Sequence, residues 1–183
     1  MPEHLEIIDA CALLNLYASG SLEAILKSRR QPCCVVEQVK QESLFIRKPS
    51  DSATSYDRKP VVLEPFFQSG LLKLVKLESE AEQELFVNLA AQIDDGEAAT
   101  IAVAISRRMQ VVTDDKKAIR VLKQEAPTLI CLSTLDVVKA WSEAMAIEPT
   151  QIKTALESII KHANYLPGKK HHLFDWWQTA VNT

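Results

Sequence analysis

Residues 94–115 read DDGEAATIAVAISRRMQVVTDD and join a helix of small residues to a strand that ends in two acids. Gly96 breaks the preceding helix, and the alanine-rich run after it predicts a new helix over residues 97–109 that can pack closely on a sheet. The apolar pair Val111 and Val112 predicts a short buried strand. A helix followed by a buried strand is typical of a parallel α/β sheet.

The same alternation extends outward in both directions. Short apolar runs predict further strands, over residues 5–10, 33–36, 71–77 and 129–132. Helical spacing predicts the helices between and after them, over residues 12–17, 22–29, 37–46, 80–93, 116–124 and onward from 134. Because strands alternate with helices, the sheet should be mainly parallel.

Two segments fall outside this alternation. Residues 48–60, KPSDSATSYDRKP, are polar and lie between prolines, so we expect a loop there. From residue 150 the sequence predicts one amphipathic helix, then LPGKKHH, and then an apolar segment with Trp176 and Trp177. We therefore expect a domain over residues 1–148 and a C-terminal helical extension over residues 149–183, docked on the body by the two tryptophans.

Length and composition fit one domain with a small appendage. The chain has 183 residues, 47% of them hydrophobic, and a formal net charge of −3, which argues against a polycation that binds nucleic acid nonspecifically. No apolar run approaches the roughly 20 residues that span a bilayer, and no basic flank precedes the first apolar run, as it would in a secretory signal. We expect a cytoplasmic protein whose cysteines are free, buried thiols: Cys11, Cys33, Cys34 and Cys131.

Acidic residues gather where the predicted strands end. Asp9 closes the first strand, and Asp114 and Asp115 close a later one. Glu97 lies in the first turn of the alanine-rich helix, and Glu42 lies on the helix after the second strand. Ligands of an open parallel sheet bind beyond the carboxyl ends of its strands. Carboxylates that meet there repel one another unless a cation joins them, and their oxygens suit Mg²⁺ or Mn²⁺. The chemistry that follows is metal-assisted hydrolysis of a phosphodiester.

Each acid also has a purely structural explanation. Asp115 could cap a helix, and Glu97 could complement a helix dipole. Glu37 and Glu42 could be solvated helix residues. Asp9 has less structural reason to close an apolar strand, and the acids taken together favour a functional site.

At these acids the chain resembles the PIN-domain family of nucleases. The matching segments stand in the family's order and cover roughly residues 4–135: EIIDACALLNL around Asp9, VEQVKQESL around Glu42, DDGEAATIAVAI around Glu97 and VVTDD around Asp115. The resemblance implies a three-layer α/β fold with a mainly parallel sheet of about five strands flanked by helices. It also implies an acidic site that cleaves RNA with Mg²⁺ or Mn²⁺.

Carried over residue by residue, the resemblance assigns the catalytic and metal-binding acids to Asp9, Glu42, Glu97 and Asp115. Asp114 is a neighbouring candidate ligand of the metal. Glu37 competes with Glu42 for the second position. We prefer Glu42 because Val39 provides an apolar anchor one turn before it.

The chain departs from the family pattern directly after the first acid. Many family members carry Ser or Thr there, followed by Asn or Ser, whereas this chain has Ala10 and Cys11, and Asn15 is too far along to replace them. A hydroxyl ligand or a group that orients water is therefore expected to be missing. The chain is also longer than the compact toxin nucleases of the family, which weakens the expectation of a toxin in a toxin–antitoxin pair.

Other functions compete with a nuclease. A phosphotransferase of the haloacid-dehalogenase type needs a second Asp where Cys11 stands, and a response-regulator receiver needs an acidic pair where only Asp9 stands. Both are disfavoured. A PIN-like module that binds nucleic acid or protein without catalysis stays open, because the net charge is negative and the hydroxyl after Asp9 is absent.

Basic residues suggest where RNA would lie. We predict substrate contacts from Thr113, Lys116, Lys117 and Arg120, joined from the side of the 48–60 segment by Arg47, Lys48, Arg58 and Lys59. Candidate partners besides RNA are an antitoxin protein and a second copy of the chain, and no membrane partner is expected. His171 and His172 are either an adventitious metal-binding pair or part of a solvated basic tail.

Overall fold

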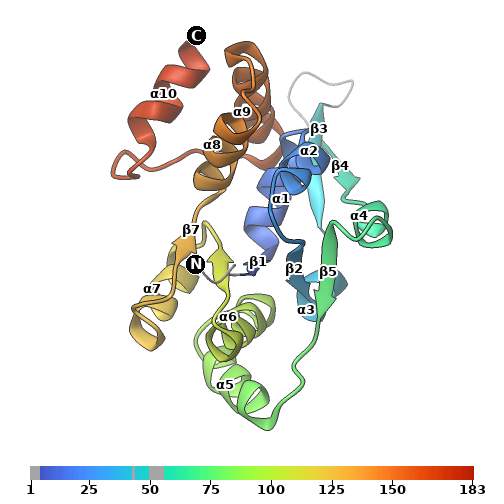
Figure 1. Ribbon diagram of the computed structural model, residues 1–183, viewed down its shortest axis with the longest axis vertical. Helices are drawn as coiled ribbons and strands as arrows, with labels where there is room; N and C mark the ends of the chain where they lie inside the picture. Colours follow the sequence, from blue (N-terminus) through green and yellow to red (C-terminus); the bar gives the residue numbers. More distant parts are fainter. Residues whose placement is uncertain (1–4, 43, 50–55) are drawn as a thin grey trace.

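A central sheet of five parallel strands organises the computed structural model, which describes residues 5–42, 44–49 and 56–183 (Figure 1). The strand order is β5-β2-β1-β6-β7, with bounds β1 (Glu6–Ile8), β2 (Cys33–Val36), β5 (Leu72–Val75), β6 (Gln110–Val112) and β7 (Cys131–Leu132). In the centre, Ile7 pairs with Cys34 on one side and with Val111 on the other. The sequence prediction of a mainly parallel sheet of about five strands is confirmed.

The helices form two packed groups. One contains α5 (Glu80–Ala90), α6 (Asp95–Arg107) and α7 (Lys116–Glu125), in which α6 contacts both of the others. The second contains α1 (Ala10–Ala18), α2 (Leu22–Lys27), α8 (Thr134–Ala144) and α9 (Pro149–Ala163), in which α1 contacts all the others. The chain adds β2 and β5 on one side of β1 and then β6 and β7 on the other side. Because crossovers between parallel strands are right-handed, this change of direction places the two groups of helices on opposite faces of the sheet. The result is the three-layer α/β fold that the sequence predicts.

Small side chains bring α6 into the core. Ala98, Ala99, Ala102 and Ala104 on this helix are all fully buried, so its backbone can approach the strands closely. Asp94 precedes the helix as its N-terminal capping residue, although its side chain makes no capping hydrogen bond. The close packing fixes the first turn of α6, which carries Glu97, at the carboxyl edge of the sheet.

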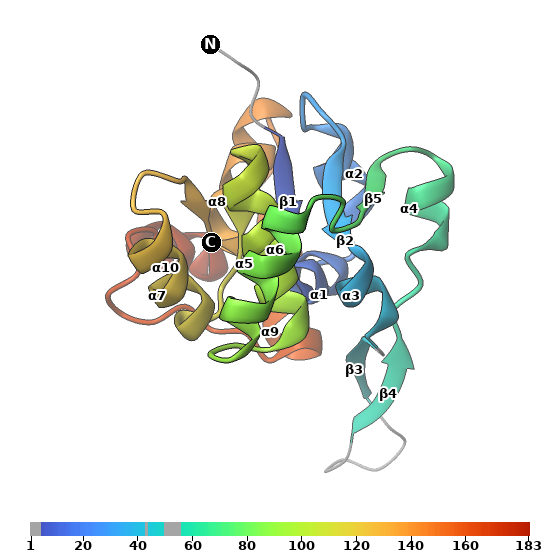
Figure 2. The same ribbon diagram turned by 90° about the horizontal axis from the view of Figure 1, so that it is seen from below.

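The sequence prediction fails between the second and third strands of the sheet. A helix was expected over residues 37–46 and a loop over residues 48–60, but α3 (Glu37–Gln41) ends early. Strands β3 (Phe45–Pro49) and β4 (Tyr56–Pro60) pair as an antiparallel hairpin that projects from the body next to α3 (Figure 2). Residues 50–55 lie outside the described part of the chain. The backbone N–H and C=O groups of these strands bond to a segment several residues away. The spacing of apolar residues within one segment does not reveal such pairing.

The C-terminal segment shares the core of the body. Ala155, Leu156 and Ile159 of α9 are buried in the same apolar cluster as the strands. α10 (Phe174–Asn182) packs on α9 (Figure 1). Its residues Trp176 and Trp177 lie half-buried against that cluster. The remaining helix, α4 (Glu64–Gln68), precedes β5. None of the described helices is long and apolar enough to cross a membrane, and all four cysteines are free thiols.

Candidate active site

Asp9 connects the central strand to the first helix. It follows β1 directly, its backbone N–H donates to the carbonyl of Val112 at 3.1 Å, and its side chain is 2% exposed. Its Oδ1 accepts the backbone N–H of Ala12 at 2.7 Å and so caps α1. The acid that closes the first strand is therefore held rigidly at the carboxyl edge of the sheet.

Thr113 and Cys11 orient the other oxygen of Asp9. The Thr113 hydroxyl and the Cys11 thiol, the latter at 3.3 Å, both donate to Asp9 Oδ2. The same hydroxyl accepts the backbone N–H of Asp115 at 3.1 Å. Although no hydroxyl follows Asp9 in the sequence, the hydroxyl of Thr113, the residue directly after β6, contacts it. Thr113 was predicted to contact substrate, but it is 1% exposed and its hydroxyl is occupied by these two partners.

The negative charges of other acids act on Glu97. It lies in the first turn of α6 and is half-buried. Burial, and next the negative charges of Asp115, Asp9 and Asp94, raise the pKa of Glu97 to about 7. Burial likewise raises the pKa of Asp9 to about 6, against the hydrogen bonds from Thr113, Ala12 and Cys11. Carboxylates from β1, α6 and the start of α7 therefore share one electrostatic environment.

Asp115 caps the basic helix α7. Its Oδ1 accepts the backbone N–H groups of Lys117 at 2.7 Å and Ala118 at 2.9 Å. The structural explanation considered for this residue is thus correct, and its charge still reaches Glu97. Lys116, Lys117 and Arg120 are exposed on the same helix, and within the described ranges none of the three takes part in an ion pair.

The structure separates the two candidates for the second acid. Glu37 points away and pairs with Lys76 at 3.0 Å. Glu42 follows α3, and its carboxylate lies against Gly96, the residue before Glu97; a Cβ at Gly96 would overlap its Oε1. Burial and the charge of Asp94 raise the pKa of Glu42. Glu42 therefore lies beside the first turn of α6, and it stays the candidate for the second acid.

Asp114 was predicted as a metal ligand, but protein donors occupy both of its oxygens. Oδ2 accepts from the side-chain amide of Asn15 at 3.0 Å and from the Thr134 hydroxyl. Oδ1 accepts the backbone N–H of Thr134 and the Tyr165 hydroxyl, both at 3.1 Å. Asp114 therefore braces α1, α8 and the segment after α9 against one another.

Sequence reasoning missed these three donors. The signal for Asn15 was available, since it is a buried amide within the apolar run ALLNLY and buried polar groups need partners. Tyr165 and Thr134 carried no comparable signal, because only the tertiary fold brings them to Asp114.

The donor set of the acids fits a hard divalent cation. Asp9, Glu42, Glu97 and Asp115 offer carboxylate oxygens from four separate segments. Burial is the main cause that raises the pKa values of Asp9, Glu42 and Glu97, and the charges of Asp115 and Asp9 add to it at Glu97. In the described part of the chain, no three of these acids bring ligand oxygens within 4.8 Å of one another. Asp9 and Asp115 each also cap a helix. A cation bound between the acids would offset the negative charges that act on Glu97.

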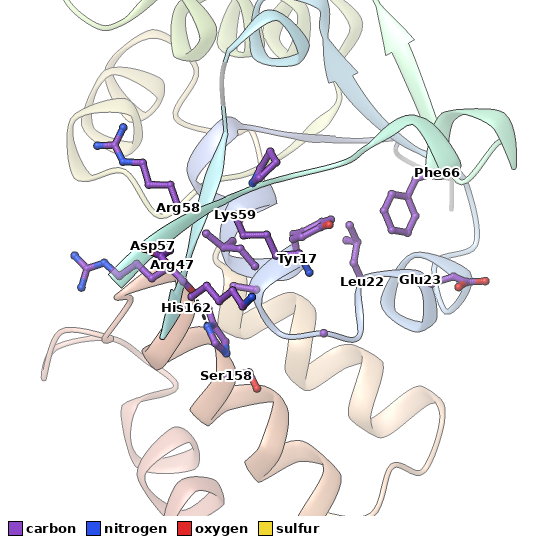
Figure 3. A pocket seen from close by; sticks show the side chains of 15 residues that line it. Tyr17, Leu22, Glu23, Arg47, Asp57, Arg58, Lys59, Phe66, Ser158 and His162 are labelled. Carbon is purple, nitrogen blue, oxygen red and sulfur yellow. Dashed lines mark hydrogen bonds between the residues drawn. The ribbon is translucent and has the colours of Figure 1, made fainter. Parts of the chain in front are cut away.

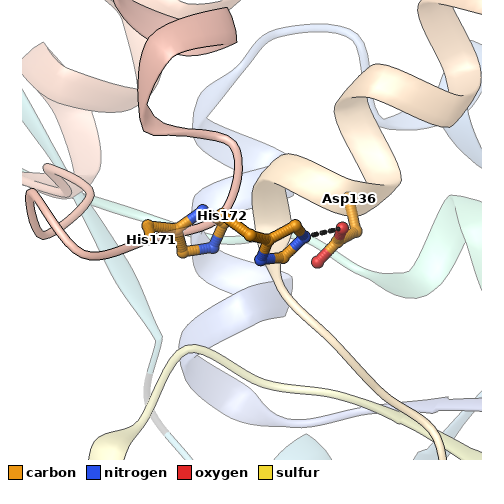
Figure 4. A group of neighbouring side chains, drawn as sticks. All are labelled: Asp136, His171 and His172. Atoms are coloured by element: carbon orange, nitrogen blue, oxygen red, sulfur yellow. Dashed lines mark hydrogen bonds and ion pairs between the residues drawn. The ribbon is translucent and has the colours of Figure 1, made fainter.

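A second group of ligand-type side chains lies on the C-terminal segment. Asp136, His171 and His172 bring ligand atoms within 4.8 Å of one another (Figure 4). His172 Nε2 lies 2.7 Å from Asp136 Oδ1, and the two imidazole rings stack with centroids 4.6 Å apart. Burial would raise the pKa of Asp136, but hydrogen bonds from Ser133 and the contact with His172 lower it. The histidine pair therefore fastens the C-terminal segment to α8 and is more than a solvated tail.

Comparison with known proteins gives one match. A family model described as a PIN domain matches residues 5–173, which include all the acids above and most of the C-terminal extension. No curated protein and no solved structure gives a significant match to the chain.

Proposed function

Since the chain belongs to the PIN-domain family, we propose that it is a ribonuclease that hydrolyses phosphodiester bonds with Mg²⁺ or Mn²⁺. PIN domains are generally nucleases. The observation that carries the finer proposal is the gathering of Asp9, Glu97 and Asp115 at one edge of the sheet, where the charges of the other two acids act on Glu97. A catalytic cluster of like charges is costly without a cation, which supports the choice of a metal-dependent reaction.

Each acid has a role in this proposal. Asp9, Glu97 and Asp115 would hold the cation, with Glu42 joining from α3. The bound metal would supply Lewis-acid polarisation of the phosphate and a water of lowered pKa. Thr113 keeps Asp9 oriented through its hydroxyl, so the oxygens of this acid are already positioned before metal or substrate binds.

The start of α7 would bind the phosphates. Lys116 and Lys117 stand in the first turn of the helix that Asp115 caps, and Arg120 follows one turn later. The N-terminus of a helix carries a partial positive charge and attracts phosphate groups. These side chains would hold the RNA backbone next to the acids.

Cleavage of a mixture of single-stranded and structured RNAs tests the proposal. We expect cleavage with Mn²⁺ or Mg²⁺ that EDTA abolishes and that Glu97→Gln reduces at least a hundredfold. Glu37→Gln is the matched control, because this neighbouring glutamate pairs with Lys76 outside the cluster, and it should keep the rate within about threefold. Cleavage that persists in EDTA, or in Glu97→Gln, would refute the proposal.

The alternative is a PIN-like module that binds nucleic acid or protein without catalysis. It is favoured by the hydrogen bonds that engage Asp9 and Asp115 as helix caps. RNA that binds tightly but stays intact with every divalent metal would select this alternative. For the nuclease, a toxin restrained by an antitoxin protein is one candidate setting, and arrested growth on expression, relieved by a neighbouring gene, would support it. We keep the cytoplasm as the proposed location and a homodimer as a candidate assembly.

A further inference from the structure

A pocket of about 800 Å³ lies between the β3–β4 hairpin and the body (Figure 3). Its other walls come from α1, α2, α4 and α9. Compact ligand sites occupy roughly 300–1,000 Å³, so this pocket can hold a nucleotide. It is distinct from the cluster of acids, none of which lines it.

The hairpin that forms one wall of the pocket is basic. It carries Arg47, Lys48, Arg58 and Lys59 against one acid, Asp57, and a second acid, Glu23, lines the pocket from α2. Lys48 and Lys59 share one face of the hairpin with Asp57, whereas Arg47 and Arg58 lie on the other face. Glu23 is already paired with Lys27 at 2.6 Å. In the parts of the chain that the structure describes, no carboxylate lies within ion-pair distance of Lys48, Arg58 or Lys59. A negatively charged ligand is therefore the natural complement of this hairpin.

Aromatic rings line the inner wall. Tyr17 and Phe66 meet edge to face with centroids 6.5 Å apart, and Lys59 lines the same pocket (Figure 3). Tyr17 is only partly buried. An aromatic ring and lysine side chains in one pocket are a combination that binds single-stranded nucleic acid, since a base stacks on the ring and cations contact the phosphates.

The hairpin is anchored to the body. The Arg47 guanidinium donates to Asn164 Oδ1 at 3.0 Å, and His162 Nδ1 lies 2.6 Å from the Arg47 carbonyl oxygen. Both partners lie at the C-terminal end of α9. The pocket is therefore formed before a ligand arrives, which reduces the entropy lost on binding.

Two segments connect the pocket to the acids. Tyr17 lies on α1, the helix that Asp9 caps, about 12 Å along the axis at 1.5 Å per residue. The backbone N–H of Leu44 donates to the carbonyl of Glu42 at 3.0 Å, and β3 begins at the next residue, Phe45. One RNA strand of a few nucleotides could therefore occupy the pocket and reach the acids.

We propose that this pocket is a nucleotide-binding subsite for single-stranded RNA, in which Lys48 and Lys59 contact phosphates and a base stacks on Tyr17. The inference rests on the proposed function, because it assigns part of the substrate to this surface. It adds a second contact region to the one on α7.

Fluorescence anisotropy with a labelled single-stranded oligoribonucleotide in EDTA tests the subsite without cleavage. We expect the charge-reversal pair Lys48→Glu/Lys59→Glu to weaken binding at least tenfold and to lower the slope of log Kd against log salt by about 0.7 for each lost phosphate contact. The matched control, Lys73→Glu/Lys153→Glu, reverses the same number of charges outside the pocket and should change Kd less than threefold. Tyr17→Leu should weaken binding at least fivefold, whereas Tyr17→Phe, which keeps the ring, should not.

Each outcome distinguishes the subsite from the nuclease. If the parent binds and cleaves RNA but the pocket variants match their controls, the subsite is refuted and the nuclease stands. If the parent neither binds nor cleaves RNA, the proposed function fails and the subsite fails with it. If the pocket variants bind RNA normally but lose binding of labelled polyglutamate, the pocket belongs to an acidic protein partner and the subsite is refuted. Thermal melts of all variants exclude loss of fold as the cause.

Discussion

At the scale of single residues, Gly96 makes room for the second acid. Its missing side chain lets the Glu42 carboxylate lie against the start of α6, and an added Cβ would also come within 3.2 Å of Val39 Cγ2. The Glu42 carboxylate is the end of a flexible side chain, so Gly96→Ala should displace it with little loss of stability.

We predict that Gly96→Ala weakens Mn²⁺ affinity and RNA cleavage at least tenfold while the melting temperature changes by only a few degrees. Gly168→Ala is the control, because an added Cβ there meets nothing within 4 Å. Equal activity of Gly96→Ala and the parent would show that the position of Glu42 is unimportant.

We expect Asp114 to support the site without binding the metal. Tyr165→Phe removes one of the hydrogen bonds that the Asp114 carboxylate accepts and should cost about 1 kcal/mol of unfolding free energy. Asp114→Asn turns an amide N–H toward other donors and should cost more, about 2–3 kcal/mol. Denaturant unfolding measures both, and the Mn²⁺ affinity of each folded variant should match that of the parent. Loss of Mn²⁺ binding in Asp114→Asn would indicate that Asp114 is a metal ligand after all.

At the scale of elements, the lysines at the start of α7 should contribute to RNA binding but not to the stability of the fold. Lys116 and Lys117 lie at the helix N-terminus, where positive charge opposes the helix dipole. We predict that Lys116→Glu/Lys117→Glu keeps or raises the melting temperature but weakens RNA binding at least tenfold, with a smaller salt dependence. Lys123→Glu, near the other end of the helix, should have a much smaller effect on binding. An unaltered RNA affinity in the double variant would show that these lysines are exposed to solvent and do not contact RNA.

A helix or strand can be predicted from the sequence when the pattern that indicates it lies within one continuous segment. The alanine-rich helix and the strand after it were predictable, because spacing and burial act within one segment. The β3–β4 hairpin was not, since its register joins Phe45 to Pro60 across the chain. The candidate site follows the same division. Its acids were visible at strand ends. The contact of Thr113 with Asp9 and that of Asn15 with Asp114 join residues about a hundred positions apart, and Thr134 and Tyr165 reach Asp114 from 20 and 51 positions away.

At the scale of the whole molecule, the acids make the metal-free protein sensitive to pH. The folded-state pKa values of Asp9, about 6, and Glu97, about 7, lie above their ordinary values of 3.8 and 4.5. Between about pH 4 and pH 7 the folded state therefore binds more protons than the unfolded state, and its stability falls as pH rises.

We predict that the melting temperature in EDTA decreases between pH 5 and pH 8. Because Glu97 contributes to this decrease, the decrease should be smaller in Glu97→Gln. At pH 8 Glu97→Gln should melt above the parent in EDTA, by up to about 1 kcal/mol in free energy after allowance for solvent screening. Thermal melts across this range measure both effects. A steeper decrease in the variant would contradict the repulsion on which the site is built.

The central claim is that Asp9, Glu97 and Asp115 form one metal site, and calorimetric titration with Mn²⁺ tests it most directly. The titration should be done at pH 7.5 on the parent, Glu97→Gln and Glu37→Gln. We predict saturable binding by the parent and by Glu37→Gln, with affinities within about threefold of each other, and affinity at least tenfold weaker in Glu97→Gln. Binding of Mn²⁺ that is the same in all three proteins, or absent from the parent, would contradict the account.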